Sequence, residues 1–405
     1  MRVVLVILGG CVAWSPRAED LAKSLHFTSA EKCGVCHVDL YQQWQTSAHS
    51  RAAVDPVFWQ FFQQAARDQK DLSAAACLTC HSPVGSVTKE FSVTGRVSFP
   101  VQLSAVGREG VTCDFCHTIQ GGEYFGKNIG VGVYRYGHKG DTATKYGTHA
   151  DATTTEHATE VSPFLKNAEF CGICHKFTHP VSDTVWQDTY AEWKDGPYAK
   201  EGRTCQDCHM PTYEGRGTTD GPVRTNLSAH VFPGSYSDMI KKAATVSVWA
   251  GLKPKSVDRK LQVKALVSNS GSGHLMPTGI PGIRQMWLEV VVRGANTLEV
   301  ASRKSEFLIE ILGADGKPAM PWNAVSFGRD TRIAPRKSRE TIFEVPLDAS
   351  GEPVEVEATV FYRQISEFAA QAAGIKASPP IGIAADRIRV FPDGRIEKLA
   401  MASPR

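Results

Sequence analysis

Residues 33–37 read Cys33-Gly34-Val35-Cys36-His37, and this pattern of two cysteines followed by a histidine occurs five times in the chain. The other copies are Cys77-Leu78-Thr79-Cys80-His81, Cys113-Asp114-Phe115-Cys116-His117, Cys171-Gly172-Ile173-Cys174-His175 and Cys205-Gln206-Asp207-Cys208-His209. Together they use ten of the eleven cysteines and leave only Cys11 outside them. Because the pattern repeats so regularly, whatever it binds must be built into the fold five times.

Cys-x-x-Cys-His is the attachment site of c-type haem. The two thiols form thioethers with the vinyl groups of the porphyrin, and the adjacent histidine becomes the proximal ligand of the iron. A zinc site does not require a histidine directly after each second cysteine, and a disulfide framework does not require one either. The sequence therefore predicts a pentahaem cytochrome that carries five haem c groups.

Two sets of site residues follow from the motifs. The cysteines predicted to hold haem are Cys33, Cys36, Cys77, Cys80, Cys113, Cys116, Cys171, Cys174, Cys205 and Cys208. The histidines predicted to bind iron on the proximal side are His37, His81, His117, His175 and His209. We assign no catalytic side chain.

The composition is ordinary for a globular protein, with 42% hydrophobic and 21% charged residues among 405. The formal charge of +3 does not describe the haem-loaded protein. Each haem brings two propionates, so five haems shift the total charge by roughly −5 to −10. The loaded protein should therefore be acidic or near neutral, and we predict no nucleic-acid partner.

The first 18 residues resemble a secretory signal peptide. A short basic head, Met1-Arg2, precedes a mostly apolar run from Val3 to Trp14 that is too short to span a bilayer comfortably. No other segment reaches eighteen apolar residues. We expect cleavage after Ala18 and export to the periplasm or the outer surface of a bacterial cell envelope, where c-type haem is attached.

A second interpretation of this segment concerns its cysteine. Leu8-Gly9-Gly10-Cys11 resembles a lipobox, in which Cys11 would carry a lipid that anchors the protein to a membrane. In the alternative, Cys11 belongs to a signal peptide that is removed. Membrane association could also come from a membrane-bound partner.

All five motifs lie in the first 210 residues, so each haem has only about 35–45 residues of chain around it. The haems themselves must therefore form much of the core, with short helices and loops packed around them. We predict a mainly α and irregular multihaem cytochrome domain over residues 19–243. Its clearer helical segments are Asp39 to His49, Val57 to Ala66 and Asp188 to Lys194.

The pattern changes after about Ala243, where apolar residues begin to alternate with polar ones. Such stretches cover residues 261–267, 287–292, 307–311, 342–345, 354–362 and 388–390. Regularly spaced short strands predict an all-β domain over residues 244–395, of the immunoglobulin-like sandwich type. A helix is expected near Phe368 to Ala373, and residues 396–405 are expected to form a tail.

Eight histidines remain after the proximal ligands are assigned, out of thirteen in the chain. Histidine is the common sixth ligand in multihaem cytochromes and gives low-spin, low-potential iron. Met210 follows His209 directly and cannot reach across to the distal side of the same haem.

Over about residues 30–290 the chain resembles the multihaem c-type cytochromes related to the tetrahaem, cytochrome c-554-like partner of hydroxylamine oxidoreductase. The segments that carry the resemblance are Trp44–His49, Glu109–His117, His157–Cys171, Glu192–Trp193, Cys205–Pro211, His230–Gly234 and Asn269–Gly279. The resemblance implies that the distal ligands are His49, His157, His230 and His274. The fifth is open between His138, His149, His179 and His26, and one haem could lack a protein ligand on its distal side.

The leading function is electron transfer through closely packed haems, between a donor and an acceptor redox protein. The alternative is an oxidoreductase that acts on a small nitrogen compound or a sulfur oxyanion at a five-coordinate haem. The absence of a Cys-x-x-Cys-Lys motif counts against that enzyme. The β-domain would either dock the cytochrome to a partner or cap a haem, and His274 favours the cap.

Overall fold

The computed structural model describes residues 26–69, 74–92, 99–122, 134–136, 144–178, 185–253, 260–294, 299–347 and 351–400. The predicted signal peptide with Cys11 lies outside these residues, as do the candidate ligands His138 and His179. Within the part of the chain that is described, no helix has the length and apolar character needed to cross a bilayer.

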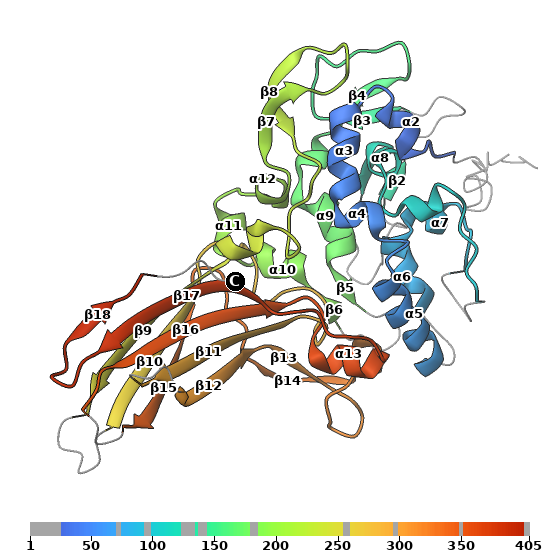
Figure 1. Ribbon diagram of the computed structural model, residues 1–405. Helices are drawn as coiled ribbons and strands as arrows, with labels where there is room; N and C mark the ends of the chain where they lie inside the picture. The colour runs from blue at the N-terminus through green and yellow to red at the C-terminus, as the bar shows by residue number, and fades with distance from the viewer. Residues whose placement is uncertain are drawn as a thin grey trace, which may run out of the picture.

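The N-terminal part consists of short helices and small sheets (Figure 1), and each of the five motifs lies wholly or partly in one of these helices. Its helices are α2 (Ala30–Gly34), α3 (Val38–Thr46), α4 (Ala48–Arg51), α5 (Pro56–Asp68), α6 (Ala74–His81), α7 (Pro83–Val87), η1 (Gly107–Glu109), α8 (Cys113–His117), η3 (Pro163–Lys166), α9 (Ala168–His175), α10 (Thr189–Lys194), α11 (Pro197–Lys200), α12 (Cys205–His209) and η4 (Asp238–Lys242).

Its strands pair two by two in small sheets. These pairs are β1 (Ile119–Gly122) with β2 (Tyr134–Tyr136), β3 (Lys145–Gly147) with β4 (Thr159–Val161), β5 (Phe177–Thr178) with β6 (Val185–Gln187), and β7 (Thr212–Arg216) with β8 (Val223–Ser228). Among the described residues, these short elements bury a small apolar cluster of their own, made by Val84, Phe115, Ile119 and Ile173. A core this small agrees with the prediction that haems fill much of the region.

The helix predicted over residues 39–49 is broken in two. Ser47 takes an extended conformation with ψ 161°, ends α3 and caps α4, and its hydroxyl accepts a hydrogen bond from the amide of Ser50 at 3.3 Å. Serine favours this capping role over a place inside a helix. The break redirects the chain just before His49, which then lies on the separate helix α4.

The C-terminal part is rich in β-structure. A three-stranded sheet has the order β15 (Ser338–Pro346), β10 (Lys260–Asn269) and β9 (Ala244–Leu252). A five-stranded sheet has the order β12 (Glu299–Phe307), β11 (Gln285–Arg293), β16 (Val354–Arg363), β17 (Ile381–Val390) and β18 (Ile396–Lys398). A hairpin of β13 (Ile309–Leu312) and β14 (Ser326–Asp330), the turn η5 (Pro321–Asn323) and helix α13 (Glu367–Ala373) complete this part.

One apolar core lies between the two sheets. Alternate residues of β10, β11 and β16 point into it, among them Val263, Val290 and Val356, which are fully buried. This arrangement agrees with an all-β C-terminal region, and the immunoglobulin-like type stays a prediction. The predicted tail begins with a strand, because residues 396–398 form β18 and pair with β17. The two domain boundaries stay predictions.

The two parts share a second apolar core. Phe62 of α5 and Leu78 of α6 belong to the same buried cluster as Ile283, Met320 and Trp322 of the β-rich part. The indole Nε1 of Trp322 also donates a hydrogen bond to Asp68, which ends α5, at 2.8 Å. Figure 1 shows α5 beside α13 at this junction. The β-rich part is therefore packed against the helical part and not merely tethered to it.

Candidate haem-binding site

Each motif from the second to the fifth ends a helix, and the first begins within α2, whose last two residues are Cys33 and Gly34. Residues three and four apart lie on the same side of a helical turn. One turn therefore presents both thiols and the imidazole of a motif to the same surface. This local geometry explains why a five-residue segment can hold one porphyrin at three points.

Four of the five proximal histidines make the same backbone contact through Nδ1. The partners are the carbonyl oxygens of Gly217 for His37 (2.7 Å), Ala52 for His81 (2.9 Å), Tyr146 for His117 (2.6 Å) and Pro233 for His209 (2.7 Å). A carbonyl can only accept, so Nδ1 carries the proton and the lone pair of Nε2 is free for a metal. Metal-ligating histidines are held in this way, and the residues present therefore fit haem iron.

His175 of the fourth motif has a side-chain partner instead. The amide nitrogen Nε2 of Gln187 lies 3.2 Å from its Nδ1. With the amide turned by 180°, its oxygen would accept the Nδ1 proton, as the carbonyls do for the other four rings. The contact ties α9 to β6, which contains Gln187.

The cysteines show which motifs are neighbours. Three pairs of thiols are close enough to shift one another's pKa: Cys113 lowers the pKa of Cys33, Cys174 lowers that of Cys80, and Cys205 raises that of Cys171. The first motif therefore lies beside the third, the second beside the fourth, and the fourth beside the fifth. All ten motif cysteines are free thiols, so none of them is used in a disulfide.

Two distal candidates face proximal histidines at a matching distance. The ring centres of His117 and His230 are 6.1 Å apart, and those of His49 and His175 are 6.3 Å apart. Two rings on opposite sides of one metal are separated by two metal–nitrogen bonds of about 2 Å each and by about 1.1 Å from each nitrogen to its ring centre. Their centres therefore lie about 6 Å apart. Both pairs therefore have room for one iron between them.

The environment of these rings keeps them neutral. Burial lowers the pKa of His49 to about 3, and nearby His175 adds to the effect. Burial also lowers the pKa of His230 to about 4, with His117 as the next cause. The Nδ1 of His230 lies 2.9 Å from the carbonyl oxygen of Ser228, so its Nε2 is free in the same way as in the proximal rings. A neutral imidazole is the form that binds a metal.

The segment from His230 to Pro233 touches three of the sites at once. His230 faces His117, and the carbonyl of Pro233 holds His209. Between them, Phe232 lies edge-on to His49 at 4.5 Å and to His230 at 5.8 Å. Phe232 has a φ of +43°, which is unusual for a residue with a side chain. Sequence analysis did not single out Phe232, because an isolated phenylalanine in a loop gives no signal.

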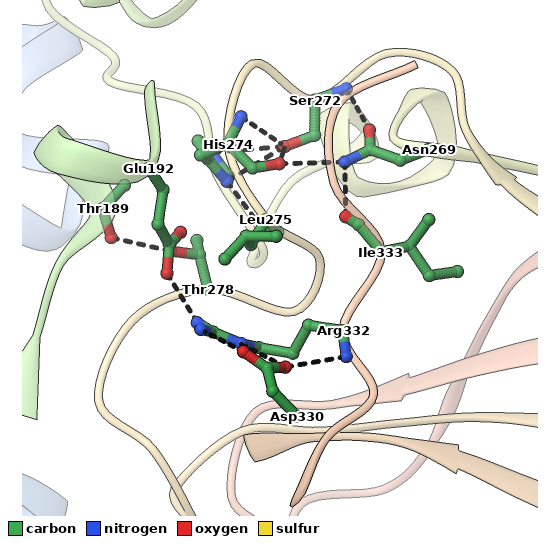
Figure 2. Close-up of polar contacts among 10 residues, drawn as sticks. All are labelled: Thr189, Glu192, Asn269, Ser272, His274, Leu275, Thr278, Asp330, Arg332 and Ile333. Carbon is green, nitrogen blue, oxygen red and sulfur yellow. Dashed lines mark hydrogen bonds and ion pairs between the residues drawn. The ribbon is translucent and has the colours of Figure 1, made fainter. Parts of the chain in front are cut away.

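His274 lies at the junction of the two parts (Figure 2). Its Nδ1 is 3.0 Å from the carbonyl oxygen of Leu275, and the Asn269 side chain donates to the His274 carbonyl at 2.9 Å. Burial lowers the pKa of His274, and His209 of the fifth motif is close enough to add to the effect. His274 is therefore close enough to His209 of the fifth motif, and to His175 of the fourth, for their charges to interact.

Of the remaining distal candidates, the structure describes His149 and His157 and brings neither of them to a proximal histidine. His157 makes a contact of 3.2 Å with the carbonyl of the next residue, Ala158. Within the described ranges, neither His149 nor His157 has a ring contact with a histidine of a motif. His81 of the second motif stacks on Phe58, with ring centres 3.9 Å apart and planes 9° apart.

Comparisons with known proteins agree with this picture. Residues 32–118, which contain the first three motifs, match a family model described as cytochrome c554 and c-prime. Cytochrome c-552 of Haemophilus ducreyi is 25% identical over 169 residues, which make up 38% of this chain and 29% of that protein. The chain therefore matches less than a third of the length of that relative.

The motifs and these matches support a multihaem c-type cytochrome family for this chain. The structure is similar to the crystal structure of a penta-heme cytochrome c552 from Thermochromatium tepidum, with a TM-score of 0.67 and 21% sequence identity. That similarity covers 91% of this chain and 100% of the other, so it includes the β-rich part. The resemblance expected from the sequence is confirmed.

Proposed function

We propose that the chain binds five haem c groups and transfers electrons between two redox proteins in the bacterial cell envelope. Bound haem supplies a metal that cycles between the ferric and ferrous states. The chain supplies two thiols and one proximal histidine at each motif. The observation that carries the proposal is the repeated Nδ1 contact of four proximal rings, because it prepares each Nε2 to bind iron.

Two ring distances and one pKa shift support three distal assignments. His230 would complete the third site, opposite His117, and His49 would complete the fourth, opposite His175. His274 would complete the fifth site, opposite His209. Two neutral imidazoles on one iron give low-spin, low-potential iron, which suits electron transfer. His157, His149 and His138 remain candidates for the first two sites.

The contacts between motifs support an order for the sites. The first motif adjoins the third through Cys33 and Cys113, and the third lies close to the fourth through Cys116 and Cys171. The fourth adjoins both the second and the fifth. Neighbouring sites in this order would exchange electrons directly, with the first motif at one end. Cys36 of that motif is exposed, which suits contact with a redox partner.

The second motif supports the alternative function. Within the part of the chain that is described, no histidine ring contacts His81, whose own ring stacks on Phe58. An iron held there without a distal side chain would be open to a small nitrogen compound or a sulfur oxyanion. The electron-transfer and enzyme proposals are compatible if only this site is open.

A redox titration followed by electron paramagnetic resonance (EPR) on the purified, haem-loaded protein tests the proposal. We expect low-spin signals from at least three sites. A high-spin signal that shifts when nitrite or nitric oxide is added would support the alternative at the second motif. A spectrum without low-spin iron would contradict all three distal assignments.

A further inference from the structure

A buried polar cluster joins α10 of the helical part to two loops of the β-rich part (Figure 2). Glu192 of α10 accepts a hydrogen bond from the guanidinium of Arg332 at 2.5 Å and another from the hydroxyl of Thr278 at 2.6 Å. The side chains of Glu192 and Arg332 are only 5% and 13% exposed. We propose that Glu192 and Arg332, here called the positioning pair, hold His274 against the fifth motif. The inference rests on the proposed role of His274 as a distal ligand.

The two loops that contact Glu192 are residues 270–284, between β10 and β11, and residues 331–337, between β14 and β15. Hydrogen bonds join them to each other. The backbone amide of Met276 donates to the carbonyl of Ile333 at 3.0 Å, and the amide of Ile333 donates back to Met276 at 2.9 Å. The Asn269 side chain donates to the carbonyls of both His274 and Ile333, at 2.9 and 3.0 Å. A shift of Arg332 or Thr278 should therefore also shift the backbone of His274.

Helix α10 is in turn fixed to the haem-binding part. The ring of Tyr190 packs so closely on Gly172, inside the fourth motif, that a Cβ there would lie 2.6 Å from the ring. The indole of Trp193 donates to the carbonyl of Arg203, just before the fifth motif, at 2.9 Å. Glu192 lies between these two anchors. Glu192 is therefore held in place relative to the fourth and fifth motifs. Its contact with Thr278 holds the turn that contains His274 relative to the same motifs.

The chemistry of the cluster favours a defined geometry. Asp330 makes a second ion pair with Arg332 at 2.8 Å, so one guanidinium is shared by two carboxylates. The hydroxyl of Thr278 donates to Glu192, so its oxygen can accept from the hydroxyl of Thr189 at 2.8 Å. Buried charges that lose one partner are strongly unfavourable, and hydrogen bonds to them are directional. An apolar contact would hold the two parts together without fixing the direction of the His274 ring.

The same junction offers a matched control. Arg336 makes two hydrogen bonds to Glu201, at 2.5 and 2.7 Å, and this pair also joins the two parts of the chain. Its side chains are about half exposed, and Glu201 makes no described contact with the turn that contains His274. Loss of this pair removes an ion pair from the interface without touching the positioning pair.

The test compares Glu192→Gln, Arg332→Gln and Glu201→Gln in the haem-loaded protein, by visible and EPR spectroscopy. We expect all haems to stay attached in each variant. Glu192→Gln and Arg332→Gln should lose one haem's share of the low-spin signal, and added imidazole should restore it. Glu201→Gln should give the wild-type spectrum. An equal loss in Glu201→Gln would overturn the proposal, because general loosening of the junction would then suffice.

Thr278→Val and Thr278→Ser cover the case in which a buried charge change prevents folding. Thr278→Val keeps the ion pair and removes only the hydroxyl that links Glu192 to the turn, so it should lose part of the same low-spin signal. Thr278→Ser keeps the hydroxyl and should match wild type. Wild-type spectra in both Glu192→Gln and Thr278→Val would overturn the positioning role if His274→Ala becomes high-spin. A low-spin His274→Ala would instead refute the ligand assignment itself.

Discussion

The imidazole rings of His117 and His230 lie with their centres 6.1 Å apart and their planes only 23° apart. The rings of His49 and His175 lie at 6.3 Å, but their planes are 64° apart. The angle between two axial rings affects the energies of the iron d orbitals. Parallel rings interact with the same d orbital, and crossed rings interact with different ones. The two sites should therefore differ in their EPR signals although their ligands are the same.

The first prediction separates these two signals by mutation. His230→Ala should convert one haem from low-spin to high-spin and remove the rhombic low-spin signal expected of near-parallel rings. The signal of the His49–His175 pair should stay in place. His49→Ala should have the converse effect. Added imidazole should restore each lost signal. The assignment of pairs is wrong if both variants lose the same signal.

The second prediction concerns the turn that supports His49. Gly110 has φ +72° and ψ −131°, and a Cβ at this position would lie 2.3 Å from the carbonyl oxygen of His49. Gly110→Ala should lower the free energy of unfolding by more than about 3 kcal/mol, because it combines backbone strain with a clash. The haem served by His49 should show an altered low-spin signal.

Gly202 provides the control for strain alone. Its φ is +75°, and nothing lies within 4 Å of an added Cβ. Gly202→Ala should cost about 1 kcal/mol and leave every haem signal unchanged. Equal costs and equal spectra for the two variants would show that Gly110 does not support His49. Denaturant unfolding and EPR on the same samples provide both measurements.

The third prediction tests the apolar core shared by the two parts. Trp322 is buried against α5 and donates to Asp68 at 2.8 Å. Trp322→Ala should lower the free energy of unfolding by about 3–5 kcal/mol. Trp249 of β9 is 47% exposed, so Trp249→Ala should change stability by no more than about 0.5 kcal/mol. Similar denaturation curves for the two variants would mean that the parts are not held together through Trp322.

The fourth prediction concerns pH and the sheet of β16 and β17. Hydrogen bonds from Arg389 and Arg387 hold the pKa of Glu355 below its ordinary value. A lowered folded-state pKa gives stability that is present above the unfolded value of about 4.3 and is lost as the pH falls through the folded value. Glu355→Gln should therefore cost about 0.5–1 kcal/mol at neutral pH.

In acid, below about pH 4, this difference from wild type should shrink and then disappear. Denaturant unfolding followed by circular dichroism at a series of pH values provides the measurement. A difference that stays constant over the whole range would show that the ionised carboxylate is not its cause.

The residues of the motifs could be identified from the sequence, but the distal histidine that faces each proximal histidine could not. The motif is local, because attachment needs groups that lie within one helical turn. The pairing of His117 with His230, and of His49 with His175, joins residues far apart in the chain, and no local pattern encodes it. The carbonyl partners of the proximal rings are also invisible in sequence, because every residue has a backbone oxygen.

The strands were predictable where apolar residues alternate strongly. Five of the six predicted stretches fall within single strands from β10 to β17, the stretch 307–311 spans the end of β12 and the start of β13, and the helix expected near residues 368–373 is α13. Strand β9 was missed although Val246 and Val248 follow the same alternation, since small alanines at its buried positions weaken the signal. The positioning pair was missed for another reason, because Glu192 and Arg332 meet only after both parts have folded.

The central claim is that one chain holds five covalent haems. The most direct measurement is a pyridine haemochrome assay on the purified protein, together with its intact mass after denaturation. We expect five haems per chain that stay bound in denaturant, because thioethers are covalent, and the loss of one haem when both cysteines of one motif are replaced. A content of about two haems per chain would contradict the account.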